Sequence, residues 1–315
     1  MTCQDIEKPK LIVILGPTAS GKSDLAVKLA LKFNGAIISA DSRQVYKGLD
    51  IGSGKIAKKE MQGIAHYLLD IASPKKTFSV SQYQKLANLA LKKILKSGKI
   101  PIICGGTGFY IDTLIYDYQL PDTPPQKKLR KKLEKKTSEE LFNQLKKLDS
   151  RRARSIDKKN RRRLIRALEI VLMTGRPVKI IKAKKSPYNF LSIGIKKSPE
   201  ELKKLISQRL KKRIKQGIIK EVENLHQKQK LSWQKLDNFG LEYRFVSRYL
   251  RGLITKQEMA KLIEIESWRY AKRQMTWFKR NKNIHWIKSP KKAEKITKFF
   301  LNPINNKRID SSDKS

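Results

Sequence analysis

The residues best suited to chemistry form a glycine-rich stretch, GPTASGKS, at positions 16–23. It follows the apolar run 11–15 and precedes a helical apolar pattern, the context in which G-x-x-x-x-G-K-S is typical of a phosphate-binding loop. Gly16 and Gly21 let the backbone curl with its N–H groups inward, and the next helix N-terminus adds positive potential. Lys22 supplies a point charge, and the Ser23 hydroxyl can bind Mg²⁺ held between phosphate oxygens. The stretch predicts a phosphate or diphosphate site without specifying ATP; the alternative is a flexible surface turn.

A second candidate is Asp41, which directly follows an apolar strand predicted over 36–40. In doubly wound sheets, ligands bind beyond the carboxyl ends of the strands, so this carboxylate is placed to face whatever the loop holds. The alternative is that Asp41 only caps the next helical turn. A further glycine-rich segment, 105–108, follows the strand predicted over 100–104 and allows another close approach of backbone to ligand.

The elements that must position these residues alternate between strand and helix. A typical amphipathic helix is predicted over 80–95, and short apolar runs predict strands at 11–15, 36–40, 66–71, 100–104 and 191–195. This alternation predicts an α/β fold with a parallel sheet. From residue 198 to about 270 the pattern is helical, with breaks expected at Gly217, Gly240 and Gly252.

A proline-rich shift at 121–125 indicates a domain boundary. The predicted organisation is the first part of the core at 1–120, a helical basic insertion domain at 121–190, a mostly helical continuation of the core at 191–288, and a basic polar, disordered tail at 289–315.

The charge balance points to a polyanionic partner. The 315 residues carry a formal net charge of +44, and residues 127–166 hold 18 basic against 5 acidic side chains. Arginine's forked donors suit phosphate, so a nucleic-acid face is the favoured interpretation of the arginine-rich part, 151–166. A solvated charged helix and a lineage-wide lysine bias are the alternatives. The segment 272–280 interleaves bases with aromatics, which is typical both of nucleic-acid clamps and of helices with core aromatics.

Composition also excludes several classes of protein. The two cysteines are far apart and the three histidines are scattered, so neither a disulfide framework nor a zinc site is predicted. The first ten residues are polar, and no apolar run approaches membrane-spanning length. We therefore expect a cytoplasmic protein that does not associate with membranes.

Six motifs together resemble the tRNA dimethylallyltransferase (isopentenyl transferase) family in order and spacing. They are GPTASGKS at 16–23, ISADSRQVYKGLDIGSGK at 38–55, HYLLDI at 66–71, GGTGFY at 105–110, NRRRLIRALE at 160–169 and AKRQMTWFKR at 271–280. The match covers roughly residues 10–287, and the combination is more specific than any one motif.

The resemblance implies a P-loop NTPase-like parallel sheet core with an inserted, mostly helical domain. It implies transfer of a dimethylallyl group from dimethylallyl diphosphate to the exocyclic N6 amine of adenosine 37, 3′-adjacent to the anticodon, in tRNAs that read codons beginning with U. Diphosphate is released. The implied partners are the donor and the tRNA anticodon stem-loop, the implied cofactor is Mg²⁺, and the expected state is a monomer.

The resemblance also implies roles for residues that match the family motifs. The catalytic group is Asp41 as general base, with Thr107 and Lys22. The donor-binding group is Gly16, Thr18, Ala19, Ser20, Gly21, Lys22, Ser23, Arg209 and Arg273, with Ser23 as the Mg²⁺ residue. The tRNA-binding group is Asp41, Ser42, Arg43, Gln44, Thr107, Arg162, Arg163, Leu164, Ile165, Arg166, Lys272 and Gln274.

The chain departs from the family pattern at two places. Leu205 stands where the family usually has an arginine, and Arg209 and Arg213, one and two helical turns further along the same face, are both candidates to replace it. At 240–244 the chain reads GLEYR, where the family more often has Gly, an aromatic residue, a base and then Glu.

Three rival functions are consistent with single features. A P-loop kinase shares the first loop, and a transferase acting on free adenine nucleotides shares the chemistry, but neither gives the basic insertion a role. A non-enzymatic RNA-binding protein explains the charge but leaves the loop and Asp41 unused.

Overall fold

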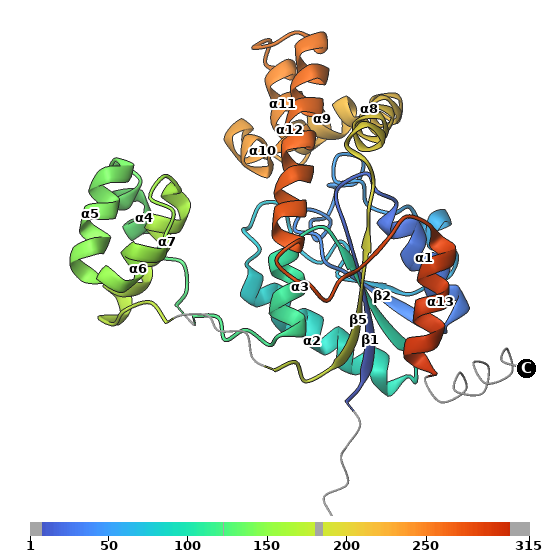
Figure 1. Cartoon of the computed structure of the whole chain (residues 1–315). Helices are drawn as coiled ribbons and strands as arrows, with labels where there is room; N and C mark the ends of the chain where they lie inside the picture. The colour runs from blue at the N-terminus through green and yellow to red at the C-terminus, as the bar shows by residue number, and fades with distance from the viewer. Residues whose placement is uncertain (1–7, 122, 180–184, 303–315) are drawn as a thin grey trace, which may run out of the picture. The chain divides into compact units, whose positions relative to one another are not determined.

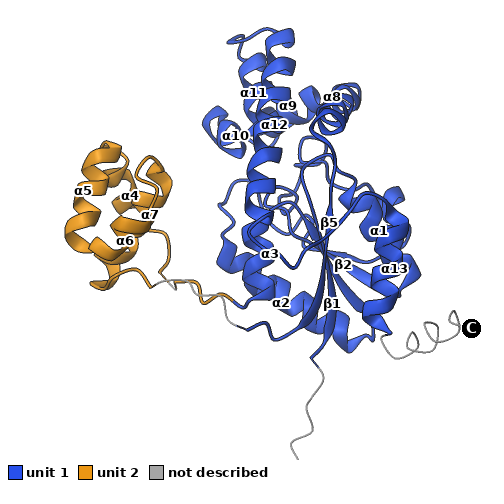
Figure 2. Cartoon of the chain, in the orientation of Figure 1, with its two compact units in different colours: residues 1–117, 185–315 blue, residues 118–184 orange. Residues whose placement is uncertain are grey.

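The computed structural model describes residues 8–121, 123–179 and 185–302. The chain divides into two compact units, which are residues 1–117 with 185–315, and residues 118–184 (Figure 2). The sequence places an insertion domain at 121–190, and the second unit occupies nearly the same part of the chain.

Within the described part of the first unit, six parallel strands form one sheet in the order β3-β2-β4-β1-β5-β6 (Figure 1). The strands are β1 (Lys10–Leu15), β2 (Gly35–Ser39), β3 (His66–Tyr67), β4 (Ile100–Gly105), β5 (Asn189–Ile195) and β6 (His285–Ile287). This sheet, interrupted by a helical insertion, confirms the fold class predicted from the sequence.

Helices cover both faces of the sheet, because alternate strand residues point to opposite sides. In the central strand β1, Leu11, Val13 and Leu15 pack in one cluster with α2 (Val80–Lys96) and α3 (Gly108–Ile115). Ile12 and Ile14 pack in another cluster with α1 (Lys22–Lys32) and α13 (Pro290–Leu301). Figure 1 shows the two helix layers on either side of the strands. The sheet therefore holds the loops at its carboxyl edge on a rigid base.

Helix α2 illustrates how local sequence sets the element boundaries. Ser79 caps its start by accepting the Gln82 N–H, and the Gln82 side chain bonds back to the Ser79 N–H. Gly98, with φ of 66°, follows its end. The predicted helix at 80–95 is confirmed.

A helical arm of the first unit follows β5 and connects back to β6. Its helices are α8 (Pro199–Lys215), α9 (Ile218–Gln227), α10 (Trp233–Phe239), α11 (Leu241–Leu250) and α12 (Lys256–Phe278). Gly217, Gly240 and Gly252 have φ of 94°, 77° and 70° and lie at the breaks between helices, as predicted. No helix in the described part of the chain is long and apolar enough to cross a membrane.

The second unit has its own hydrophobic core. Its helices are α4 (Lys127–Leu133), α5 (Ser138–Leu148), α6 (Ser150–Ser155) and α7 (Arg161–Thr174). Leu141, Leu145, Leu164 and Leu168 are fully buried in that core. The predicted helical pattern at 127–166 is confirmed.

Three elements differ from the sequence predictions. The strand predicted over 66–71 has only two residues, because Leu68 and Asp70 take positive φ values of 67° and 55° and end the extended run. The short edge strand β6 is not predicted from the sequence.

The third difference is α13, which occupies 290–301 where a disordered tail is predicted. Ala293, Ile296 and Phe300 pack against the cluster under α1, so an apolar helical face lies within this lysine-rich segment. The rest of the predicted tail, 303–315, lies outside the described residues.

Candidate active site

The loop between β1 and α1 has the backbone of a phosphate cradle. Gly16 and Gly21 have φ of 149° and 84°, and Ala19 also lies in the left-handed region at 63°. A Cβ on Gly16 would lie 3.1 Å from the Ile195 carbonyl oxygen and 3.2 Å from Ser20 Oγ, so the loop is tightly wound. The buried Ser20 hydroxyl has no hydrogen-bond partner among the described residues. A buried, unpartnered hydroxyl in a tightly wound glycine-rich loop fits an anion.

Lys22 begins α1 within this loop, and its Nζ donates to the Pro17 carbonyl at 2.7 Å. Burial lowers the pKa of Lys22 to about 8; Cys104 and Asp41 oppose this lowering, and Arg209 adds to it. An anion arriving at Lys22 would favour its charged form.

Asp41 follows β2 by two residues and is half-buried. Its Oδ1 accepts the N–H groups of Arg43 at 2.8 Å and Gln44 at 3.4 Å, so Asp41 does cap the next turn. Within the described residues, no hydrogen bond reaches its other oxygen, Oδ2. The cap uses one oxygen and leaves the second available to accept a proton.

Thr107 holds the Asp41 turn against the second glycine-rich segment. The Ser42 N–H donates to Thr107 Oγ1 at 3.1 Å, and the Thr107 N–H donates to the Ala40 carbonyl at 3.1 Å. Thr107 also lies near the Tyr270 hydroxyl of α12, whose pKa it lowers.

Tyr270 is a site residue that sequence reasoning misses. Burial raises its pKa, and the Asp41 charge raises it further, so its hydroxyl lies within electrostatic reach of that carboxylate. One signal was available, because Tyr270 lies one helical turn before Gln274 in the motif at 271–280.

Arg209, rather than Arg213, is the arginine of α8 at this site. Burial and Arg213 lower the pKa of Arg209 to about 10, whereas Glu242 and Asp41 oppose the lowering. No described residue forms a hydrogen bond or ion pair with Arg209, while Arg213 is buried in an ion pair with Glu242. The geometry thus favours Arg209 as the replacement for the arginine that is missing at Leu205.

Gln274 lies between the two glycine-rich loops. It is 5% exposed; its Oε1 accepts the Thr18 N–H at 2.7 Å, and its Nε2 donates to the Gly106 carbonyl at 2.9 Å. Both ends of the amide are engaged, so Gln274 joins the two glycine-rich loops in this structure, and its contact with tRNA stays a prediction.

The other basic and aromatic residues of 272–280 divide between the two interpretations of this segment, a nucleic-acid clamp and a helix with core aromatics. Lys272 and Arg273 are exposed and lie over the rings of Trp268 and Tyr270, each 5.8 Å from the ring centroid. Arg273 thereby borders the Tyr270 side of the site. Phe278 is buried in the core, which is the alternative to nucleic-acid stacking.

Arg43 and Gln44 are engaged within the protein. Arg43 Nε donates to the Phe239 carbonyl at 2.7 Å, and the guanidinium lies 5.9 Å from the Phe239 ring centroid. The Gln44 amide accepts from Ser39 Oγ at 3.0 Å and donates to the Gly54 carbonyl at 3.1 Å. In this structure both side chains brace the Asp41 turn.

The residues of α7 that are predicted to contact tRNA fall into three classes by their exposure and their partners. Arg162 and Arg163 are exposed on its first turn, as a phosphate contact requires. Leu164 and Ile165 are 0% and 8% exposed in the core of the second unit. Helical periodicity turns these two side chains inward, and the contact of this part of the segment with tRNA stays a prediction.

Arg166 differs from Arg162 and Arg163 because a carboxylate of the same unit binds it, and its contact with tRNA stays a prediction. Its Nη1 lies 2.6 Å from Oε2 of Glu169, and its Nη2 donates to the Thr123 carbonyl at 2.9 Å. Glu169 is fully buried and also pairs with Arg130, whose Nε and Nη2 each lie 2.7 Å from its carboxylate. Arg166 therefore holds the second unit together.

Groups that could hold a metal ion with protein ligands alone are absent from the described residues, since no three His, Cys, Asp or Glu side chains cluster there. The Ser23 hydroxyl in the first turn of α1 fits a metal ion whose other ligands are phosphate oxygens.

The chain is similar to known proteins along most of its length. Residues 44–281 match the family model described as IPP transferase. A tRNA dimethylallyltransferase of Anoxybacillus flavithermus is 43% identical over 281 residues, covering 88% of this chain and 90% of the relative. That of Staphylococcus epidermidis is 37% identical over 322 residues, covering 98% and 96%.

Solved structures agree with these sequence matches. The crystal structure of the tRNA delta(2)-isopentenylpyrophosphate transferase from Staphylococcus epidermidis is similar with a TM-score of 0.70 and 37% identity, covering 94% of this chain and all of that chain. A eukaryotic dimethylallyltransferase acting on tRNA is similar with a TM-score of 0.80 and 25% identity, covering 94% and 80%.

Proposed function

This chain belongs to the IPP transferase family and is a tRNA dimethylallyltransferase, and we propose from this premise how its own residues perform the transfer. The dimethylallyl group passes from dimethylallyl diphosphate to the N6 amine of adenosine 37, next to the anticodon of tRNAs that read codons beginning with U. The observation that carries the proposal is the unbonded Oδ2 of Asp41, in a carboxylate within electrostatic reach of both Lys22 and Arg209.

The donor diphosphate binds in the loop Gly16–Ser23. Its charge grows as the allylic carbon–oxygen bond breaks, and the inward N–H groups and Lys22 stabilise that charge where it develops. Arg209, which has no partner among the described residues, supplies a second cation. Mg²⁺ held by Ser23 and the diphosphate oxygens would neutralise further charge on the leaving group.

The acceptor amine needs a base, because its lone pair is delocalised into the adenine ring. Asp41 takes the amine proton at Oδ2 as the nitrogen–carbon bond forms, a type of assistance worth roughly 10²–10⁴-fold in rate. Oδ1 keeps its bonds to the Arg43 and Gln44 N–H groups, which hold the carboxylate in place. The Thr107 hydroxyl orients the target base beside it.

The tRNA presents the target adenosine out of its base stack, since a half-buried carboxylate is out of reach of a stacked base. The exposed arginines of α7, Arg162 and Arg163, contact tRNA phosphates in the anticodon stem-loop. We further propose that the enzyme acts as a monomer. Its tRNA substrate supports a cytoplasmic location.

The test is incubation with unmodified tRNA and labelled dimethylallyl diphosphate, followed by nucleoside analysis. We expect labelled N6-dimethylallyladenosine at position 37, and competition by inorganic pyrophosphate. A Lys22→Ala variant should be slow with every tRNA. Hydrolysis of ATP stimulated by tRNA, without prenyl transfer, would instead support the kinase-like alternative.

A further inference from the structure

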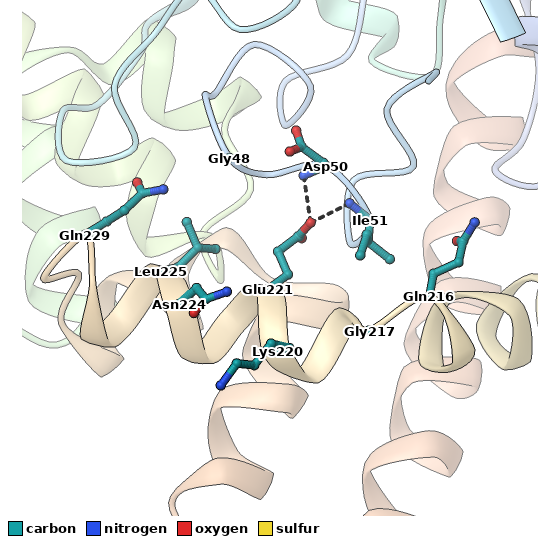
Figure 3. A pocket seen from close by; sticks show the side chains of 10 residues that line it. All are labelled: Gly48, Asp50, Ile51, Gln216, Gly217, Lys220, Glu221, Asn224, Leu225 and Gln229. Carbon is teal, nitrogen blue, oxygen red and sulfur yellow. Dashed lines mark hydrogen bonds between the residues drawn. The ribbon is translucent and has the colours of Figure 1, made fainter. Parts of the chain in front are cut away.

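The segment 48–54, which follows the Asp41 turn, is held by the helical arm through a partly buried carboxylate. Three successive N–H groups, of Asp50, Ile51 and Gly52, donate to Glu221 of α9 at 3.1, 2.6 and 3.1 Å. Figure 3 shows the Glu221 carboxylate directed at the Asp50 and Ile51 N–H groups, at the wall of a pocket of about 390 Å³. A turn of consecutive N–H groups commonly binds anions, and here the anion is a side chain of the protein.

Tyr243 of α11 completes this attachment. Its hydroxyl accepts the Ser53 N–H at 3.1 Å and donates to Glu221 Oε1 at 2.9 Å. Burial raises the pKa of Tyr243, so the hydroxyl stays protonated and able to donate. A Cβ on Gly52 would lie 2.6 Å from the Tyr243 ring, so segment and ring are in close contact.

A second attachment is the ion pair between Arg213 of α8 and Glu242 of α11. The two residues are 5% and 4% exposed. The Arg213 guanidinium lies directly against Gly54, whose φ is 64°, and a Cβ at that position would collide with it. Arg213 therefore determines where the Gly54 peptide lies.

Two hydrogen bonds connect Gly54 to the carboxylate of Asp41. The Gly54 carbonyl accepts Gln44 Nε2 at 3.1 Å, and the Gln44 N–H donates to Asp41 Oδ1 at 3.4 Å. A displacement of Gly54 would pass through Gln44 to the turn that aims Asp41.

We propose that the Arg213–Glu242 ion pair is a positioning pair for prenyl transfer, which fixes Gly54 and, through Gln44, the direction of the Asp41 carboxylate. The inference rests on the proposed function, which supplies the role of Asp41. Stability alone is a weak reason for such a pair, because the cost of desolvating two charges often cancels their attraction. Glu242 and Tyr243 lie where the chain departs from the pattern that the family more often shows.

The test uses the double variant Arg213→Met/Glu242→Leu, because apolar replacement of both partners avoids an unpaired buried charge. We expect a melting temperature near that of the wild type, unchanged tRNA affinity, and single-turnover prenyl transfer slower by about 10- to 100-fold. The matched control is Lys220→Met/Glu223→Leu, which removes an exposed ion pair of the same arm and should leave the rate unchanged.

The same double variant is then made in an Asp41→Asn background. If the pair acts through Asp41, the combined variant should be hardly slower than Asp41→Asn alone. If the rate loss of the double variant multiplies with that of Asp41→Asn, the inference is wrong. It is also wrong if the double variant has a normal rate in the wild-type background. Failure of the proposed base is a separate result, because Asp41→Asn by itself would then transfer the prenyl group normally.

Discussion

Replacing Asp41 by Asn should slow prenyl transfer by about 10²-fold or more while costing at most about 1 kcal/mol of unfolding free energy. Asn keeps an oxygen that can accept the N–H groups of Arg43 and Gln44, as Oδ1 now does at 2.8 and 3.4 Å. The atom that replaces the unbonded Oδ2 is an amide nitrogen, which cannot take a proton at neutral pH. The two roles of Asp41 are thereby separated within one side chain.

Asp41→Ala is the matched variant, because it removes the cap as well as the base. We expect the same loss of rate as in Asp41→Asn, together with a stability loss of about 1 kcal/mol from the missing cap. A comparison of the two melting curves isolates the cap, and comparison of either rate with the wild type isolates the base.

The assay is single-turnover transfer from labelled dimethylallyl diphosphate with excess enzyme, alongside thermal melts and tRNA binding. Asp41 raises the pKa of Lys22, so its loss lowers that pKa further below about 8. Rates are therefore compared at about pH 7 and again about one pH unit lower, where Lys22 is more fully charged. If Asp41→Asn is stable, binds tRNA and transfers at nearly the wild-type rate, Asp41 is not the base. The acceptor would then be water or the departing diphosphate.

Three further predictions follow from the site and the second unit. Lys22 loses its charge as the pH rises through about 8 in the free enzyme, so kcat/KM for the donor should fall above that pH. Because folding lowers the pKa of Lys22, the unfolded chain binds more protons between about pH 8 and 10.5, and the free energy of unfolding should rise with pH over that range. Lys22→Met should remove this rise, measured by denaturant unfolding. Arg166→Ala should destabilise the second unit by about 1–3 kcal/mol, because the buried Glu169 carboxylate loses one of its partners. Arg163→Ala should leave the melting temperature unchanged and reduce the salt slope of tRNA binding by about one. Equal salt slopes for Arg163→Ala and wild type would show that Arg163 is only solvated and does not contact tRNA. Gln274→Leu should cost about 1–3 kcal/mol for each of the two backbone groups left unpaired and weaken donor binding with little change in tRNA affinity. A selective loss of tRNA affinity would instead support the predicted tRNA contact.

The sequence was most informative where function depends on short-range pattern. The loop at 16–23, the position of Asp41 after β2 and the glycine breaks of the helical arm all follow from residue types within a few positions of one another. Local patterns also identified both interpretations of Asp41, and the structure shows that its cap is real without occupying the whole carboxylate.

Long-range pairing explains what the sequence could not predict. Arg166 and Arg163 belong to one basic cluster, but only Arg166 pairs with Glu169. Glu169 also binds Arg130, 39 positions away in the sequence. Arg213 and Arg209 share a helical face, and Glu242, 29 positions from Arg213, decides which one pairs. The α13 helix was not predicted for a related reason, because its lysines dominate the composition, while its few apolar residues pack in a cluster with α1 and strands far away in the sequence.

The entry and exit of the insertion have a consequence for how this enzyme can diversify. Tyr116, just before the second unit, and Phe190, just after it, pack edge to face with ring centroids 5.9 Å apart, so the chain leaves and rejoins the sheet at one point. The entropy of closing a loop rises only slowly with its length, so a longer or shorter insert costs the sheet little. Since Glu169, Arg130 and Arg166 all belong to the insert, its buried charge is balanced internally. Mutations can therefore accumulate in the second unit at their own rate, without the compensating changes that the phosphate loop and its neighbours would otherwise demand.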